Sequence, residues 1–315
     1  MPWFRRAPAL PADAPTGERL ADVLAAVRRI ELQPGNLITD VLTGGYRSTF
    51  RGSGVEFHDV REYVEGDEPR TVDWNVTARL GRPFVKRYVE ERERTLMFAL
   101  DLSAPMASGL GAWSLRQAAA RLCCCLGRMA IDNHDRVGLI AGAGAVSRFV
   151  LPRAGGGHVL RVLRDCVELP HEAGAANVES LLAHAAGRLA RRTVLFVLSD
   201  FAGTTPWPSL LPCARRHDIV AVRLLAAEVH APPPALLAVQ DPVSGQRSCI
   251  DFAAAGPRAA YAERVQQWLA VRNAQFQRAG VDVLDLALPM QPDLEAIVKP
   301  LARWFRRRCL RAVRR

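Results

Sequence analysis

The sequence predicts an α/β protein with a doubly wound, mostly parallel sheet and helices on both faces of that sheet. Residues 95–100 and 193–198 are almost wholly apolar, and each run is too short for a helix, as is typical of strands buried on both faces. Segments with helical spacing of apolar residues lie between these runs. Strands that alternate with helices at such lengths indicate a doubly wound sheet.

The composition is that of a folded protein with an excess of positive charge. Hydrophobic residues make up 49% of the 315 residues, which is ample for a packed core, and the formal net charge is +10. No apolar run reaches the roughly 18 residues that span a bilayer, and no apolar stretch follows the two arginines near the N-terminus, so we expect no signal peptide. The seven cysteines show no pairing or metal-ligand spacing. We therefore expect a cytoplasmic protein with free thiols.

The chain divides into three parts. Residues 1–17 are rich in proline and alanine, and we expect them to be disordered. Residues 18–94 hold a helix at 18–32, a charged segment at 56–79 and a strand at 83–89. Residues 95–315 form the α/β domain, which ends in a basic helix.

The order of elements within the α/β domain follows from changes in the spacing of apolar residues. We expect further strands at 218–225 and 281–286, and hairpins at 136–151 and 236–251, each built around a turn. Helical spacing predicts helices at 114–131, 158–169, 178–190, 207–216, 257–279 and 292–308.

Polar side chains follow the two most apolar strands. Asp101 and Ser103 come directly after residues 95–100, and Asp200 follows residues 193–198. The carboxyl ends of parallel strands are where such folds bind ligands, so we expect these side chains at one edge of the sheet. Carboxylate and hydroxyl oxygens suit Mg²⁺ or Mn²⁺. The alternative is that the two aspartates only cap the helices that follow them.

The charged segment at 56–79 mixes both signs of charge with aromatic residues. We interpret it as an ordered surface segment held by ion pairs, in which arginines such as Arg61, Arg70 or Arg79 meet Asp59, Glu62 or Asp73. Two roles remain open, a docking face for a partner and a strap that covers one edge of the sheet. The residues that would contact a partner are Asp59, Arg61, Glu62, Tyr63, Asp67, Arg70, Asp73, Trp74 and Arg79.

This segment resembles the signature of the bacterial family called domain of unknown function 58. The resemblance rests on the run from Asp59 to Arg79 and on the acidic and basic residues at 90–93, and it continues through Asp101-Leu-Ser103 and Leu198-Ser-Asp200. Members of that family have a von Willebrand factor A-like domain and are commonly encoded beside MoxR-type AAA+ ATPases. The resemblance therefore implies a von Willebrand factor A-like fold, with such an ATPase and an unknown client protein as partners.

The von Willebrand A fold carries a metal-ion-dependent adhesion site, and the resemblance implies a degenerate form of it here. Asp101, Ser103 and Asp200 match three of its positions. Pro105 stands where a second serine is expected, and Asn177 is the candidate for the threonine position. Proline has no side-chain oxygen, whereas asparagine still offers a carbonyl oxygen. The resemblance thus implies Mg²⁺ as the only cofactor, held by fewer ligands than usual.

Three functions compete at this point. The first is a non-enzymatic adaptor that binds the ATPase through the rim formed by Asp101, Ser103, Asn177 and Asp200. The second is a serine hydrolase with Ser103 as the nucleophile and Asp101 as its orienting acid, although no nucleophile-elbow motif is present. The third is a nucleic-acid or membrane-surface binder that acts through the arginine-rich residues 303–315.

Overall fold

The centre of the molecule is a twisted sheet whose strands are mostly parallel. The computed structural model describes residues 19–31, 46, 55–64, 66–68, 71–90, 94–203 and 205–313. Among these residues six strands form the central sheet, namely β3 (Thr95–Asp101), β4 (Arg136–Gly142), β5 (Val146–Arg153), β6 (Val194–Ser199), β7 (Asp218–Leu225) and β10 (Asp282–Ala287). Their order is β10-β7-β6-β3-β4-β5, and only β5 runs antiparallel to its neighbour. The predicted fold class is confirmed.

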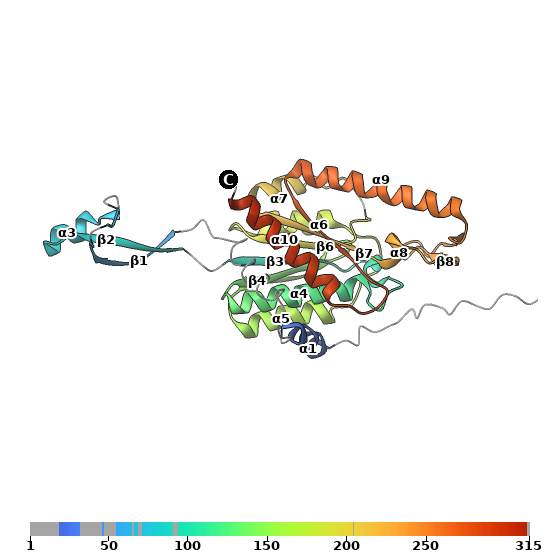
Figure 1. Cartoon of the computed structure of the whole chain (residues 1–315), viewed down its shortest axis with the longest axis horizontal. Helices are drawn as coiled ribbons and strands as arrows, with labels where there is room; N and C mark the ends of the chain where they lie inside the picture. Colours follow the sequence, from blue (N-terminus) through green and yellow to red (C-terminus); the bar gives the residue numbers. More distant parts are fainter. Residues whose placement is uncertain are drawn as a thin grey trace, which may run out of the picture.

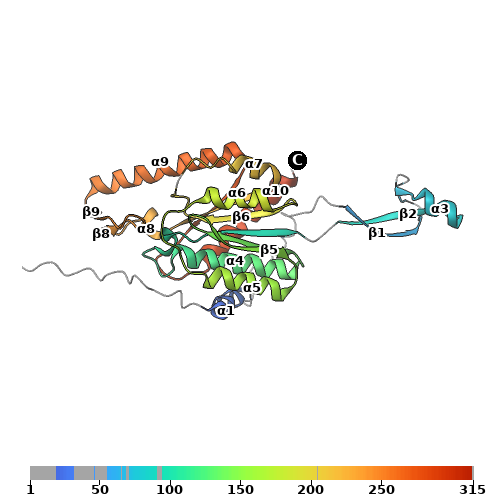
Figure 2. The same cartoon turned by 180° about the vertical axis from the view of Figure 1, so that it is seen from behind.

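Helices cover both faces of this sheet because the side chains of its inner strands are apolar on both sides (Figure 1). Phe98 and Leu100 point to one face and Met97 and Ala99 to the other, as expected for the alternation of a strand. The first face packs against α4 (Leu115–Asp132), α5 (Gly156–Glu168) and α10 (Glu295–Val313), and α1 (Leu20–Glu31) packs on the outside of α4 and α5. The second packs against α6 (Val178–Arg188), α7 (Leu210–Arg216) and α9 (Ala255–Ala279), which Figure 2 shows from behind.

A small lobe lies apart from the sheet. It comprises β1 (Val55–Glu62), α3 (Trp74–Leu80) and β2 (Phe84–Glu90), and β1 pairs with β2 in an antiparallel ladder. Figure 1 places this lobe beyond the amino end of β3. The alternative of a strap along the edge of the main sheet is therefore wrong, because β1 and β2 pair with each other and neither joins that sheet. We call residues 55–90 the lobe.

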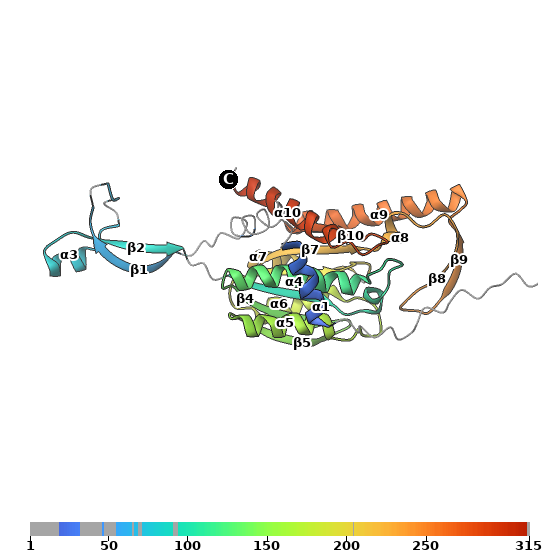
Figure 3. The ribbon, with the colours of Figure 1, turned by 60° about the horizontal axis from the view of Figure 1, so that its bottom comes forward.

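A second projection lies at the opposite end of the molecule. After α8 (Ala227–His230), the strands β8 (Leu236–Gln240) and β9 (Arg247–Asp251) form the predicted hairpin, and the first half of α9 extends beside it (Figure 3). Nearly every side chain of the hairpin and of residues 255–267 is exposed. The sheet is thus flanked by a projection at each end.

The predicted helices and strands of the α/β domain are present with small shifts at their ends. The helix predicted at 207–216 begins only at Leu210, and the last helix runs to Val313 instead of residue 308. No helix in the described ranges combines the length and the apolar character needed to cross a bilayer. The predicted disordered segment at 1–17 lies outside the described residues.

Candidate functional site

The two aspartates singled out by the sequence lie at the carboxyl ends of neighbouring strands. β3 and β6 are parallel and adjacent, with Leu100 opposite Leu198, so Asp101 stands beside Ser199 and Asp200 follows directly. Burial of both faces of these strands fixes this register, because a slip by one residue would turn every side chain to the wrong face. We call the site formed by Asp101, Ser103 and Asp200 the rim.

Asp101 is buried and its carboxylate is held on both sides. Its Oδ2 atom accepts a hydrogen bond from the Ser199 hydroxyl at 2.6 Å, and its Oδ1 atom accepts one from the Ser103 backbone N–H at 2.9 Å. Burial raises the pKa of Asp101 above its ordinary value, and the hydrogen bond from Ser199 opposes that rise. The carboxylate is therefore fixed in position before any ligand arrives.

Asp200 lies beside Asp101 in a turn with unusual backbone geometry. Its Oδ1 atom accepts a hydrogen bond from the Ala202 N–H at 2.9 Å, and the intervening Phe201 has a φ of 55°. Burial raises the pKa of Asp200 to about 6, and the negative charge of Asp101 adds to that rise. The two carboxylates thus repel each other, and a positive group between them would relieve the repulsion.

Ser103 and Pro105 follow Asp101 in the loop that leads to the short 3-10 helix η2 (Ala104–Ala107). Ser103 is completely buried, and its hydroxyl makes no hydrogen bond of ordinary geometry with any described group. Pro105 lies within η2 and offers only its backbone carbonyl, which accepts hydrogen bonds from Ser108. The Ser103 hydroxyl lies close enough to Asp101 to oppose the rise in the pKa of that carboxyl, yet it forms no hydrogen bond of ordinary geometry with a described group and so remains available to a ligand.

Asn177 is the N-cap of α6. Its Oδ1 atom accepts a hydrogen bond from the Ser180 N–H at 3.2 Å, and its Nδ2 atom donates to the Gly144 carbonyl at 2.9 Å. Such N-caps commonly contribute about 1 kcal/mol to stability. Both ends of the amide are engaged, so Asn177 contributes to the rim by holding the loop at 174–177 in place.

The alternative that the two aspartates merely cap the following helices is wrong. Ser114 caps α4 through a capping box with Gln117, and α7 begins ten residues after Asp200, at Leu210. The aspartates accept their hydrogen bonds within turns at the ends of β3 and β6 instead.

Sequence reasoning missed a row of polar side chains that continues the rim across the sheet. Ser199 of β6 is opposite Arg223 of β7, and Arg223 is opposite Asp285 of β10. Arg223 is 1% exposed and binds the Asp285 carboxylate through two hydrogen bonds of 2.8 and 2.9 Å. The only hint in the sequence is that each polar residue interrupts an apolar run near the carboxyl end of its strand.

Arg272 of α9 is a second residue that sequence reasoning missed. Its guanidinium group is buried, donates to the carbonyls of Phe201 (3.0 Å) and Gly203 (3.2 Å), and lies over the Trp207 ring at 5.0 Å. Its charge also counteracts the rise in the pKa of Asp200. Arg272 thus ties α9 to the loop that carries Asp200.

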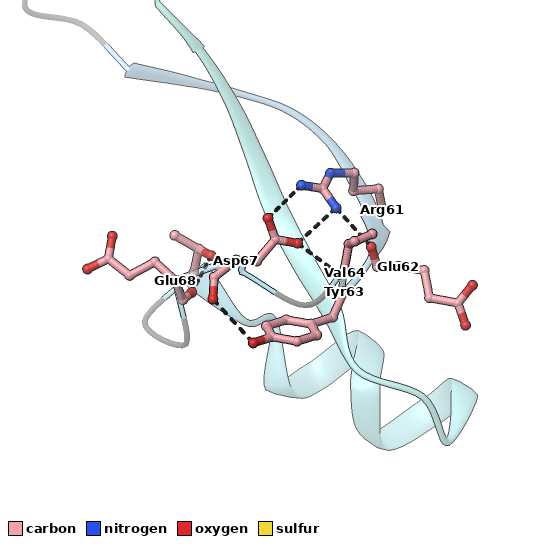
Figure 4. A network of polar contacts seen from close by, with 7 residues as sticks. Arg61, Glu62, Tyr63, Val64, Asp67 and Glu68 are labelled. Carbon is pink, nitrogen blue, oxygen red and sulfur yellow. Dashed lines mark hydrogen bonds and ion pairs between the residues drawn. The ribbon is translucent and has the colours of Figure 1, made fainter.

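The candidate docking residues of the charged segment lie in the lobe, away from the rim. Arg61 forms a bidentate pair with Asp67, at 2.8 and 2.7 Å, and Asp67 also accepts a hydrogen bond from the Val64 N–H (Figure 4). This pairing lowers the pKa of Asp67. The Tyr63 hydroxyl donates to the Asp67 carbonyl at 3.3 Å. These contacts shape the turn between β1 and α3.

The remaining docking candidates have other positions in the lobe. Asp73 is the N-cap of α3, where its carboxylate accepts from the N–H groups of Asn75 and Val76. Glu62 pairs with Arg82 at 3.4 Å, and both side chains are exposed. Trp74 is 72% exposed at the start of α3, and Arg79 is exposed in its last turn. Asp59 lies in β1, and Arg70 lies outside the described residues.

The oxygen donors of the rim fit a weakly held Mg²⁺. Mg²⁺ commonly binds through one or two carboxylates and keeps several waters, which matches Asp101, Asp200 and the unbonded hydroxyl of Ser103. Within the described residues no third acidic, histidine or cysteine side chain joins the two carboxylates. Among the described residues, an ion here would therefore find no more than two charged side chains as ligands.

Comparisons with known proteins agree with the organisation described so far. The family model described as "Protein of unknown function DUF58" matches residues 59–270. Uncharacterised proteins of Mycobacterium tuberculosis and Mycobacterium bovis are 30% identical over 227 residues, which is 70% of this chain and 71% of theirs.

Similar solved structures include the conserved hypothetical protein BatB from Bacteroides thetaiotaomicron, with a TM-score of 0.41 and 14% identity over 68% of this chain and 98% of that one. The SpRpn10 VWA domain has a TM-score of 0.38 and 14% identity over 66% and 94% of the two chains.

Proposed function

Because this chain belongs to the DUF58 family of proteins of unknown function, whose model spans both the lobe and the rim, we propose that it is a non-enzymatic protein-interaction module. In this proposal it acts as an adaptor for a MoxR-type AAA+ ATPase during the assembly or maturation of another complex. The rim is the docking site, and it receives an acidic side chain of the partner.

The observation that carries the proposal is the geometry of the rim. Two carboxylates are held by hydrogen bonds at the end of the sheet, and the buried Ser103 hydroxyl beside them forms no hydrogen bond of ordinary geometry with a described group. A bound Mg²⁺ would supply a positive charge that both carboxylates and an acidic partner can share. Hydrogen bonds that are already in place reduce the cost of ordering the site upon binding.

The serine-hydrolase alternative gains no support from this geometry. A nucleophilic serine needs a base that accepts a hydrogen bond from its hydroxyl, and the Ser103 hydroxyl forms no hydrogen bond of ordinary geometry with a described group. Asp101, its expected orienting acid, accepts from the Ser103 backbone and from Ser199 instead.

Binding of the purified full chain to a purified MoxR-type ATPase tests the proposal. We expect binding that depends on the nucleotide state of the ATPase and on Mg²⁺, and that weakens about tenfold in Asp200→Asn. Asp132→Asn, which removes one exposed carboxylate just before the amino end of β4, at the opposite end of the sheet, is the matched control and should bind normally. Absence of binding with ATP, with ADP and without nucleotide would refute the adaptor role.

A further inference from the structure

A group of exposed arginines lies at the end of the sheet opposite the rim. Arg188 ends α6, Arg191 and Arg192 precede β6, and Arg215 lies in the last turn of α7, just before β7. All four side chains are exposed. We call Arg188, Arg191, Arg192 and Arg215 the basic edge.

Contacts between α6 and α7 bring the members of the basic edge together. Arg216 donates to the carbonyls of Ala186 (2.5 Å) and Leu189 (3.3 Å), which joins the end of α7 to the end of α6. Burial is the main reason that the pKa of His217 is lowered, and the charges of Arg216 and Arg192 lower it further. The pKa of His184 is lowered in the same way by burial and by Arg188. The positive charge at this edge therefore lowers the pKa of the two nearby histidines.

Two acidic side chains at this end of the sheet pair with arginines of the C-terminal helix and not with the basic edge. Arg308 of α10 pairs with Asp218, at the start of β7, and with Asp282, at the start of β10, while Arg311 also pairs with Asp282 at 3.1 Å. Part of the arginine-rich C-terminal helix is thus neutralised within the chain. By contrast, no described acidic side chain forms an ion pair with the four arginines of the basic edge.

The lobe is tethered at this same end and carries exposed apolar side chains. β2 ends at Glu90 and β3 begins at Thr95, so the lobe cannot lie more than about 18 Å along the chain from the amino end of β3. Trp74 is 72% exposed, Val64 60% and Leu80 59%. An isolated two-stranded hairpin is marginally stable in water, so contact with another surface would stabilise the lobe.

We propose that the basic edge, together with the lobe that projects from the same end of the sheet, binds an acidic surface of a partner protein. Arginine forms bidentate hydrogen bonds with carboxylates, and an exposed tryptophan is the kind of side chain that anchors protein interfaces. A phosphodiester backbone or a lipid headgroup layer would also match the arginines, so the test compares all three kinds of partner. The inference rests on the proposed function only in that the partner is a protein, since the rim lies at the other end of the sheet.

The test measures binding of the full chain to three anionic probes at about 150 mM salt, where weak surface attraction is screened. The probes are poly-L-glutamate, a mixed-sequence DNA duplex and phosphatidylglycerol vesicles. We expect poly-L-glutamate to bind most tightly, and the double variant Arg191→Glu with Arg192→Glu to weaken that binding about tenfold. The matched control is Arg161→Glu with Arg164→Glu, which changes the same charge at two exposed positions of α5 and should change binding less than about twofold.

A copolymer of glutamate and tyrosine tests the role of the lobe. It should bind more tightly than poly-L-glutamate, and Trp74→Ala should remove that difference. Circular dichroism of each variant confirms that the fold is intact.

Three results would overturn the inference. They are tighter binding to DNA or vesicles than to either polymer, an equal loss in the two double variants, and no binding to the polymers. Asp200→Asn separates the two proposals, because it alters the rim and should leave polymer binding unchanged.

Discussion

At the carboxyl ends of β3 and β6, Asp101 is buried, Asp200 is partly buried and both accept hydrogen bonds, whereas the arginines of the basic edge, at the amino ends of β6 and β7, are exposed. The rim aspartates, Arg223 and Arg272 each contact groups of the fold itself. The arginines of the basic edge make no ion pair with a described acid. A change at the rim therefore affects folding and binding together, while a change at the basic edge affects binding with little cost in stability.

The largest expected effect is the loss of Arg272. Arg272→Ala removes hydrogen bonds to the carbonyls of Phe201 and Gly203, leaves the acceptor of the buried Phe201 unpaired and removes the contact with the Trp207 ring, so it should lower the free energy of unfolding by about 3 kcal/mol. Arg278→Ala changes an exposed arginine one and a half turns later on α9 and should cost less than about 0.5 kcal/mol. Urea unfolding of both variants measures the difference. Equal costs would show that the link between α9 and the rim loop contributes nothing.

The second-largest loss of stability is expected when a methyl group is added at Gly203. A Cβ atom there would lie 2.2 Å from the Ala176 carbonyl, so Gly203→Ala must displace one of the two loops and should cost about 2 kcal/mol. Gly187→Ala, in the last turns of α6, meets nothing within 4 Å and should stabilise the protein by about 0.5 kcal/mol. Thermal unfolding compares them, and a neutral Gly203→Ala would contradict the close packing of the rim loops.

The raised pKa of Asp200 predicts how stability changes with pH. Because its pKa of about 6 lies above the ordinary 3.8, the folded state holds the proton more tightly, and its stabilising contribution is lost as pH rises from about 4 through 6. Asp200→Asn carries no titrating group, so its stability relative to the parent should rise by about 1 kcal/mol or more between pH 4 and pH 7.5. Urea unfolding at several pH values checks this. A constant difference across that range would show that Asp200 titrates normally.

The smallest expected change in stability is at Trp74. Its side chain is 72% exposed, so Trp74→Ala should alter the free energy of unfolding by less than about 0.5 kcal/mol. Val85→Ala, which truncates the buried Val85 of β2, is the contrasting variant within the lobe and should cost clearly more. Hydrogen exchange of the β1–β2 amides would measure both. A large loss of protection in Trp74→Ala would mean that this side chain supports the lobe itself.

The apolar runs made the main sheet predictable, because burial on both faces leaves a continuous hydrophobic pattern in the sequence. The approach of Asp101 to Asp200 was predictable for the same reason, since both follow such runs. The lobe was harder, because its charges and aromatics carry no clear period, and β1 pairs with β2 across an intervening helix. No pattern in the sequence indicated that the lobe is separate from the main sheet.

The partners of the rim were not predictable either. Arg272 reaches a carbonyl 71 residues away, and Arg223 pairs with an acid 62 residues away. Nothing in an amphipathic pattern identifies which polar residue on a helix will be turned inward. The role of Asn177 as an N-cap could be predicted from the sequence. Its second hydrogen bond, to the Gly144 carbonyl, could not, because it depends on how two loops meet.

The row formed by Asp101, Ser199, Arg223 and Asp285 places four residues from four strands on a single rung of the sheet. Because the four residues are aligned, each strand must keep the same number of residues before its polar residue. Inserting one amino acid early in any of them would rotate its polar side chain into the opposite hydrophobic layer and bring a hydrocarbon side chain into the polar rung. The polar rung therefore constrains the number of residues in each of these strands as well as their composition.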